Sequence, residues 1–264
     1  MPTLRTSTSA VLQYEDVGTG PAVLALHGGY STLTEVQGFL GSALGDRRVL
    51  SVDLPGMGES TAHGIENVAG VVSALAELVD AVVDGQPFAV LGHSFGAHLA
   101  RGLAALRPQQ VSGLALICPL VPDDLQPEPR AVVVDDGAAA HLPEWQRQEF
   151  DGYFVVHTAA TVARFAAAVV PSLGRFDADA TERVMTGDFD PSPDEVPYDR
   201  PVLVLVGRHD SFVGYRQYQG LLDAYPAATA MVLADAGHAL PHEQPELLAA
   251  ALAKWQRRVD AARR

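Results

Sequence analysis

The stretch FAVLGHSFGAHLA, residues 88–100, carries one serine, Ser94, with a glycine two residues to either side. The apolar run FAVL is typical of a buried strand, and the apolar spacing that continues after Gly96 is typical of a helix. Ser94 is therefore predicted to lie on a sharp turn from a strand into a helix. Gly92 and Gly96 carry no side chains that would clash at such a turn. A serine held there exposes its hydroxyl, and the first N–H groups of the helix stabilise negative charge beside it.

Short apolar runs alternate with helical patterns along the rest of the chain. Nearly continuous apolarity over six or seven residues is typical of strands covered on both faces, as in a parallel sheet. The runs lie at residues 22–27, 48–53, 88–93, 113–118, 201–207 and 229–235, and the helical patterns at 68–84, 97–108 and 245–259. The segment YEDVGTGP, residues 14–21, indicates a further strand and a turn, hence an antiparallel hairpin at the start. This alternation predicts an α/β fold with a mostly parallel, doubly wound sheet.

The alternation is interrupted between Pro119 and Arg200. We therefore expect a core domain of residues 1–118 and 201–264, and a mainly helical cap insertion of residues 119–200 over one edge of the sheet. The insertion carries sixteen Asp and Glu against six Arg. We interpret this charge as a solvated acidic surface that aids solubility, and the alternative is selection of neutral or cationic substrates.

The composition excludes several classes of protein. A formal net charge of −14 argues against a nucleic-acid partner, because phosphate binding needs clustered Lys and Arg. The single cysteine, Cys118, excludes an internal disulfide, and the histidines outside the motifs show no ligand-like spacing, so we expect neither metal nor cofactor. The sequence has no signal-peptide pattern and no run of 18 apolar residues. We expect a soluble, cytoplasmic monomer or homodimer that binds a small-molecule substrate and no membrane.

A serine nucleophile needs a base, and the base needs a carboxylate to orient it. In α/β sheets the functional groups follow the carboxyl ends of strands. Asp210 follows the run at 201–207, and His238 follows the run at 229–235. His242 competes with His238 for the role of base, but it lies in the segment that begins the next helix.

Four stretches resemble the α/β-hydrolase superfamily, in particular its serine-nucleophile, esterase-like branch. They are LHGG (26–29), DLPGMGES (53–60), GHSFG (92–96), and GRHD with AGH (207–210 and 236–238). The resemblance covers nearly the whole chain. It implies that Ser94 is the nucleophile, that His238 is the general base and then the acid, and that Asp210 holds the imidazole.

The resemblance also implies an oxyanion hole and its supports. Its donors would be the N–H groups of Phe95 and of one residue in the HGGY turn, with Gly29 preferred over Tyr30. His27 is interpreted as a brace of this turn, and His93 as a support beside the nucleophile.

Aromatic residues of the insertion are candidates for the roof of a substrate pocket. We assign Tyr30, Trp145, Tyr153 and Phe154 to substrate binding, and Phe150 and Phe165 are further candidates from the insertion. The alternative is that most of the insertion's aromatic residues form its own hydrophobic core.

These features predict a metal-independent serine hydrolase that cleaves a carboxylic ester, lactone or thioester of a small neutral or apolar substrate through an acyl-enzyme. A serine at position 94 differs from the dehalogenase and epoxide hydrolase branches, which use an aspartate. One alternative is an amide hydrolase like the proline iminopeptidases, although those have HGGPG where this chain has HGGYS. Others are a carbon–carbon bond hydrolase, although SFGA replaces the usual SxGG, and a non-catalytic ligand-binding homologue.

Overall fold

One eight-stranded sheet runs through the molecule in the order β1-β2-β4-β3-β5-β6-β9-β10. The computed structural model describes residues 1–263. Strands β3, β4, β5, β6, β9 and β10 run parallel, whereas β2 pairs antiparallel with both β1 and β4. The strands span Thr3–Arg5 (β1), Val11–Val17 (β2), Ala22–Leu26 (β3), Arg48–Val52 (β4), Phe88–His93 (β5), Val111–Ile117 (β6), Val202–Gly207 (β9) and Ala228–Leu233 (β10). The predicted α/β fold with a mostly parallel sheet is confirmed.

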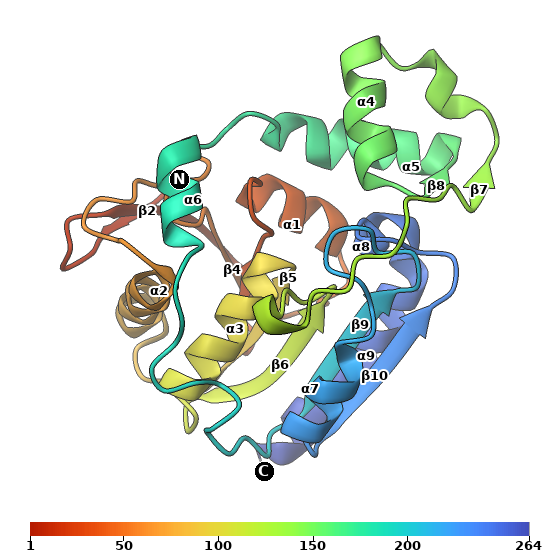
Figure 1. Cartoon of the computed structure of the whole chain (residues 1–264). Helices are drawn as coiled ribbons and strands as arrows, with labels where there is room; N and C mark the ends of the chain where they lie inside the picture. Colours follow the sequence, from red (N-terminus) through yellow and green to blue (C-terminus); the bar gives the residue numbers. More distant parts are fainter. Residues whose placement is uncertain (264) are drawn as a thin grey trace.

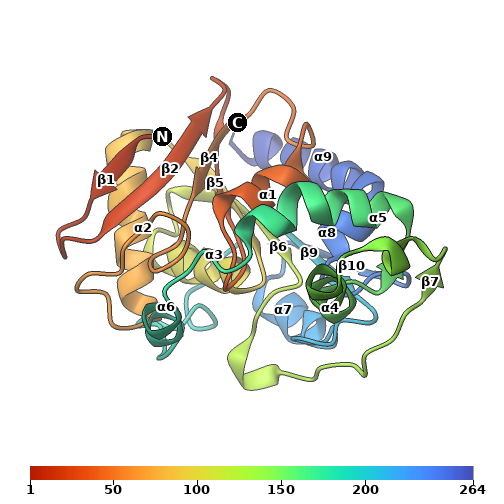
Figure 2. The ribbon, with the colours of Figure 1, turned by 90° about the horizontal axis from the view of Figure 1, so that it is seen from above.

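Helices cover both faces of this sheet (Figure 1; Figure 2). Side chains alternate along each strand, so Leu24 and Leu26 of β3 face one layer, and Val23 and Ala25 face the other. The first layer holds α2 (Val68–Val83), α3 (Phe95–Leu106) and α7 (Tyr218–Ala224). The second layer holds α1 (Leu33–Leu40), α8 (Leu240–Glu243) and α9 (Pro245–Ala262). The central strands are buried on both faces, which explains their nearly continuous apolar sequences.

Residues 119–200, here called the insertion, connect β6 to β9 and lie largely above the carboxyl ends of the parallel strands (Figure 1). The insertion contains α4 (Glu144–Tyr153), α5 (Ala159–Arg164), α6 (Ala178–Val184), and a two-stranded sheet of β7 (Val134–Asp135) and β8 (Val156–His157). Short 3-10 turns lie at Pro122–Asp124, Ala138–His141 and Val170–Ser172, and a π-helical turn at Phe165–Val169 continues α5. Its status as a separate cap domain stays a prediction.

The sheet does begin with an antiparallel hairpin, but the expected position of its turn is wrong. The hairpin joins β1 to β2 through residues 6–10, whereas residues 18–21 carry the chain past β4, which lies between β2 and β3. A Cβ atom on Gly18 would lie 2.4 Å from the backbone oxygen of Arg47, and one on Gly20 would lie 2.1 Å from that of Asp46. The two glycines therefore permit a close crossing, which a local sequence pattern does not distinguish from a hairpin turn.

Gly96 offers a test of how closely α3 packs on the end of β3. A methyl group there would lie 2.5 Å from the backbone oxygens of Leu26 and His27, so Gly96→Ala forces the helix and the strand apart. We expect the free energy of unfolding, measured in urea, to fall by roughly 1–3 kcal/mol.

Gly220→Ala is the matched control for this substitution. Gly220 also lies in a helix, α7, but an added methyl group meets no atom within 4 Å. This variant is expected to be as stable as the parent chain, or more stable by up to about 1 kcal/mol. Equal stabilities of the two alanine variants would contradict the close packing of α3 on β3.

Candidate active site

Ser94 lies on the turn between β5 and α3, as predicted. Its backbone has φ 53° and ψ −116°, and a non-glycine residue rarely adopts such a positive φ. The turn is tightly closed, because a Cβ atom on Gly92 would lie 2.2 Å from the backbone oxygen of Gly96. Ser94 is only partly buried, unlike His93 and Phe95 on either side of it. The turn therefore lifts one small polar side chain out of an otherwise buried segment.

Asp210 and His238 come from the loops after β9 and β10 and form a hydrogen-bonded pair. His238 Nδ1 lies 2.7 Å from Asp210 Oδ2, and Asp210 Oδ1 accepts the N–H groups of Phe212 and Val213 at 2.9 and 3.0 Å. Burial raises the pKa of the Asp210 carboxyl, but the charge of His238 and these hydrogen bonds outweigh it and lower that pKa overall. An ionised carboxylate only accepts hydrogen bonds, so Nδ1 of His238 donates and its Nε2 is left as an acceptor.

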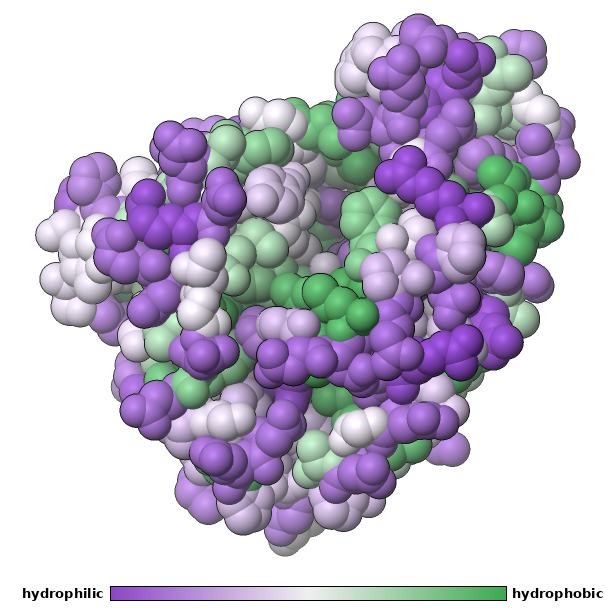
Figure 3. All heavy atoms as spheres, viewed as in Figure 1, coloured by the Kyte–Doolittle hydropathy of each residue, from purple (hydrophilic) through white to green (hydrophobic). Residues whose placement is uncertain are grey.

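Ser94 and His238 line the same cavity, which has a volume of about 550 Å³. Figure 3 shows the surface hollowed on this side of the molecule, below the insertion. One part of the lining is apolar and consists of Leu120, Phe165, Val169, Leu173, Met185, Phe212 and Val213. Another part is polar and includes Ser31, Glu35, Arg130, Gln148, Glu149 and Tyr153. The cavity thus joins a potential nucleophile and a potential base to a mixed binding surface.

The HGG turn after β3 borders the same cavity. A Cβ atom on Gly28 would lie 3.4 Å from Cβ of Ser94, and one on Gly29 would lie 3.8 Å from Cβ of Phe95. His27 Nδ1 donates to the backbone oxygen of Gly28 at 2.7 Å, and its Nε2 accepts the N–H of Leu54 at 2.9 Å. Burial lowers the pKa of His27, which keeps the ring neutral and suited to both bonds. His27 therefore braces the turn, in agreement with its interpretation from the sequence.

His93 supports the loop of His238 rather than replacing it. Its Nε2 lies 3.0 Å from the backbone oxygen of His238, and the two ring centroids are 4.8 Å apart. Burial, together with the neighbouring His238, lowers the pKa of His93 to about 4. A neutral His93 thus donates a hydrogen bond to the backbone of the candidate base.

The same region brings His93, Cys118 and His238 close enough to share a metal ion, with one donor atom of each within 4.8 Å of the others. These side chains already have partners in the described residues. His93 Nε2 bonds to a carbonyl group, His238 Nδ1 bonds to Asp210, and Cys118 Sγ lies 3.7 Å from the backbone oxygen of Gly237. Burial raises the pKa of the Cys118 thiol well above its usual value, which disfavours the thiolate that a metal requires. We therefore assign no metal to this cluster.

Glu35 is a buried acid at the cavity that no sequence motif predicted. It lies in the first turn of α1 and accepts hydrogen bonds from Ser31 Oγ and, at 2.8 Å, from the Tyr153 hydroxyl. His242 Nε2 lies 3.3 Å from its Oε1, so this histidine is paired with Glu35 and not with Asp210. Burial raises the pKa of Glu35, but His242 and Ser31 outweigh it and bring the pKa to about 2. An acid in the first turn of a helix is an ordinary capping feature, so no sequence pattern indicates this role.

Glu243, also missed, ties the loop of His238 to the insertion. One carboxylate oxygen accepts the N–H groups of Val155 and Val156 at 2.6 and 3.1 Å, and the other accepts that of Gly237 at 2.7 Å. The residue before His238 and the start of β8 are therefore fixed to the same side chain.

Some of the residues that we assigned to substrate binding line the cavity, and others do not. Tyr30 and Tyr153 line the cavity. Trp145 does not: it is 55% exposed on the outer side of α4. Phe154 is 2% exposed and stacks on Phe150 at 4.6 Å in the hydrophobic core of the insertion. The assignments of Trp145 and Phe154 are therefore corrected, because one faces solvent and the other packs inside the insertion.

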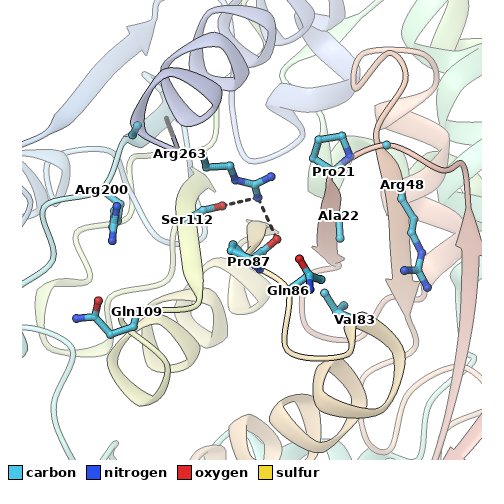
Figure 4. A pocket seen from close by; sticks show the side chains of 12 residues that line it. Pro21, Ala22, Arg48, Val83, Gln86, Pro87, Gln109, Ser112, Arg200 and Arg263 are labelled. Carbon is cyan, nitrogen blue, oxygen red and sulfur yellow. Dashed lines mark hydrogen bonds between the residues drawn. The ribbon is translucent and has the colours of Figure 1, made fainter.

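A second cavity, of about 530 Å³, lies at the opposite edge of the sheet (Figure 4). Its lining residues lie at the amino ends of strands: Ala22 begins β3, Ser112 is near the start of β6, and Arg200 precedes β9. Arg263 spans part of this cavity and donates to Ser112 Oγ at 2.7 Å (Figure 4). Binding sites of parallel α/β sheets lie at the carboxyl ends of strands, so the cavity at Ser94 is the candidate active site.

Comparison with known proteins agrees with this geometry. The sequence profile of the alpha/beta hydrolase family matches residues 23–251. The chain belongs to the alpha/beta hydrolase family. Among the described residues, no helix is long and apolar enough to cross a membrane.

Individual proteins resemble the chain to different extents. Lipase LipV of Mycobacterium tuberculosis is 41% identical over 107 residues, which cover 39% of this chain and 39% of the lipase. An alpha/beta superfamily hydrolase from Oenococcus oeni PSU-1 superposes with a TM-score of 0.89 at 21% identity, over 98% of this chain and 100% of that one. A thermophilic esterase from Thermogutta terrifontis has a TM-score of 0.70 at 22% identity, over 98% of both chains. At such identities the two structures show the shared fold alone.

The ionisation of Glu35 predicts a loss of stability in acid. Its pKa of about 2 in the folded chain lies below the ordinary value of 4.5, so its contribution is complete above pH 4.5 and declines as the pH falls towards 2. We expect Glu35→Gln to lose about 2 kcal/mol less free energy of unfolding than the parent chain when the pH falls from 6 to 3.

Urea denaturation at both pH values measures this difference. Glu246→Gln is the matched control, because Glu246 is exposed on α9. It should show the same acid sensitivity as the parent chain. An identical acid sensitivity of the Glu35→Gln variant would contradict the ionised state of the buried Glu35.

Proposed function

We propose that this alpha/beta hydrolase is a serine hydrolase that cleaves a carboxylic ester, lactone or thioester through an acyl-enzyme. The observation that carries the proposal is the hydrogen-bonded pair of Asp210 and His238 at a cavity whose wall also presents Ser94 on a strained turn. Nucleophile, base and orienting acid follow three different strands, and together they are the three groups that a serine nucleophile needs.

In the first half of the reaction, His238 Nε2 accepts the hydroxyl proton of Ser94 while Oγ attacks the carbonyl carbon of the substrate. Asp210 holds the imidazole in the required tautomer and stabilises the imidazolium that forms. The negative charge on the former carbonyl oxygen is met by the N–H groups of Gly29 and Phe95 and by the amino end of α3. His238 then gives its proton to the leaving oxygen or sulfur, and the acyl group stays on Ser94.

In the second half, water replaces the leaving group. His238 takes a proton from the water, the hydroxide attacks the acyl carbon, and the same two N–H groups stabilise the second tetrahedral intermediate. Its collapse returns the proton from His238 to Ser94 and releases the acid. All proton transfers thus pass through one side chain, whose orientation is fixed by Asp210.

Further observations support a small neutral or apolar substrate and an ester bond. The cavity of about 550 Å³ suits a small molecule, and its apolar lining includes Val169, Leu173 and Met185. The matching stretch of a protein named lipase LipV supports an ester as the bond that is cleaved, although it spans only 39% of that lipase.

Replacement of Ser94 tests the proposal. Ser94→Ala removes the nucleophile, so kcat for p-nitrophenyl butanoate is expected to fall by about 10⁴-fold or more. Ser73→Ala is the matched control, since Ser73 is exposed on α2 and bonds only to the backbone oxygen of Ala69 in the described residues. This control is expected to keep the parent kcat.

The outcome that would overturn the proposal is a Ser94→Ala variant that hydrolyses the ester as fast as the parent chain. The p-nitroanilide of the same acid, measured alongside, distinguishes ester from amide hydrolysis, because both would require Ser94. A parent chain faster on the anilide than on the ester would favour the amide alternative.

A further inference from the structure

A polar wall on one side of the cavity has no role in the proposed reaction itself. It consists of Ser31, Glu35 and Tyr153, all of which line the same cavity as Ser94. Ser31 precedes α1, Glu35 lies in α1, and Tyr153 is the last residue of α4 in the insertion. Core and insertion therefore meet at this wall.

The hydrogen bonds of the wall fix the direction of its hydroxyl groups. The Tyr153 hydroxyl donates to Glu35 Oε1 at 2.8 Å, and the Ser31 hydroxyl donates to Oε2. Each hydroxyl has a single proton, which is used in its bond to Glu35. The lone pairs of the hydroxyl oxygen can still accept hydrogen bonds. The wall can therefore accept a hydrogen bond from a ligand but has no hydroxyl proton to offer it.

The charge state of the wall keeps this arrangement fixed around neutral pH. Glu35 is ionised, since its pKa lies at about 2. Burial and the neighbouring Glu35 raise the pKa of the Tyr153 hydroxyl well above its usual value, so the phenol keeps its proton. His242 Nε2 occupies a further acceptor position of Glu35 at 3.3 Å. Three donors thus engage the two carboxylate oxygens, and the two hydroxyl oxygens offer further acceptor positions to a ligand.

Tyr153 of the wall lies close to the candidate base. The ring centroids of Tyr153 and His238 are 6.1 Å apart, and Phe212, which stacks on His238 at 4.9 Å, is 6.1 Å from Tyr153. The base returns its proton to the leaving oxygen, so the alcohol part of an ester lies near His238. Met185 borders the cavity at Gly29, where it lies within 2.9 Å of the position of an added Cβ atom.

We propose that the alcohol part of the substrate carries a free hydroxyl group, which donates a hydrogen bond to the oxygens of Tyr153 and Ser31. The substrate class is then the monoester of a diol or polyol rather than a simple alkyl ester. This inference rests on the proposed function, because it places the alcohol part by the role of His238.

A hydroxyl fits this wall better than the two obvious alternatives. An alkyl group leaves the lone pairs of Tyr153 and Ser31 unpaired in a partly buried site, which costs free energy. A cationic group would have to give up its hydration shell, while the Glu35 carboxylate that would attract it is already engaged by three donors.

Three butanoate esters with the same acyl part test the inference in the full chain. They are 2-hydroxyethyl butanoate, propyl butanoate, which replaces the hydroxyl by a methyl group of similar size, and butanoylcholine, which carries a cation without a donor. We expect kcat/KM for the hydroxyethyl ester to exceed those for the other two by roughly 10- to 100-fold. Equal values for the hydroxyethyl and propyl esters, or a preference for butanoylcholine, would overturn the inference.

Tyr153→Phe links the preference to the wall. This variant keeps the ring but removes the accepting oxygen, so the hydroxyethyl-to-propyl ratio of kcat/KM is expected to fall at least five-fold, or roughly 1 kcal/mol of discrimination. Tyr218→Phe is the matched control, because Tyr218 lies in α7 and packs against the core on the other side of the sheet. It should keep the parent ratio.

Ser31→Ala provides a second variant if Tyr153→Phe folds poorly, and it should also lower the ratio. An unchanged ratio in both variants would overturn the inference. Hydrolysis of p-nitrophenyl butanoate separates this failure from that of the proposed function. A parent chain that cleaves it without preferring the hydroxyethyl ester refutes the subsite alone, whereas a chain that cleaves none of these esters refutes both.

Discussion

The close approach of α3 to the ends of β3 and β5 is the constraint on which the site depends. Ser94 has a positive φ, which costs on the order of 1–3 kcal/mol and persists only when the surrounding structure holds it. Gly92 and Gly96 allow the turn to close, and Gly96 also lies directly on the carbonyl groups of Leu26 and His27. Since β3 continues into the HGG turn, one packing contact positions the proposed nucleophile against the proposed oxyanion donors.

A second close approach brings together the loops of Asp210 and His238. A Cβ atom on Gly207, the last residue of β9, would lie 2.2 Å from the backbone oxygen of Gly237, so the loops that carry Asp210 and His238 touch. Glu243 then fixes Gly237 to the insertion, and Glu35 joins α1, the insertion and His242. Glu243, which fixes the residue before the proposed base, thus also attaches the insertion to the core.

The parts of this molecule that the sequence predicts are those encoded by short, local patterns. The apolar run before Ser94 and the helical spacing after it predicted the strand, the turn and the helix correctly, because apolar periodicity and two glycines suffice for such elements. Asp210 and His238 were found because each directly follows a strand, and the structure does place them in contact. Their catalytic roles, like those of Gly29 and Phe95, stay predictions.

Features that depend on long-range contacts were missed or misassigned. Glu35 has two of its partners, Tyr153 and His242, in the insertion and in α8, which lie far from it along the chain. Trp145 and Phe154 are both aromatic residues near α4, and composition alone does not tell which faces solvent, a core or a cavity. The pairing of β2 with β4 is likewise set by a crossing of the chain and not by a local turn.

The central claim is that Ser94 has an activated hydroxyl, and covalent capture tests it most directly. A fluorophosphonate reacts with a serine only when a neighbouring base removes the proton and donors stabilise the charged oxygen. Mass spectrometry of the intact chain after treatment is predicted to show a single adduct, and peptide mapping is predicted to place it on Ser94. An unmodified chain, or an adduct on any other residue, would contradict the account.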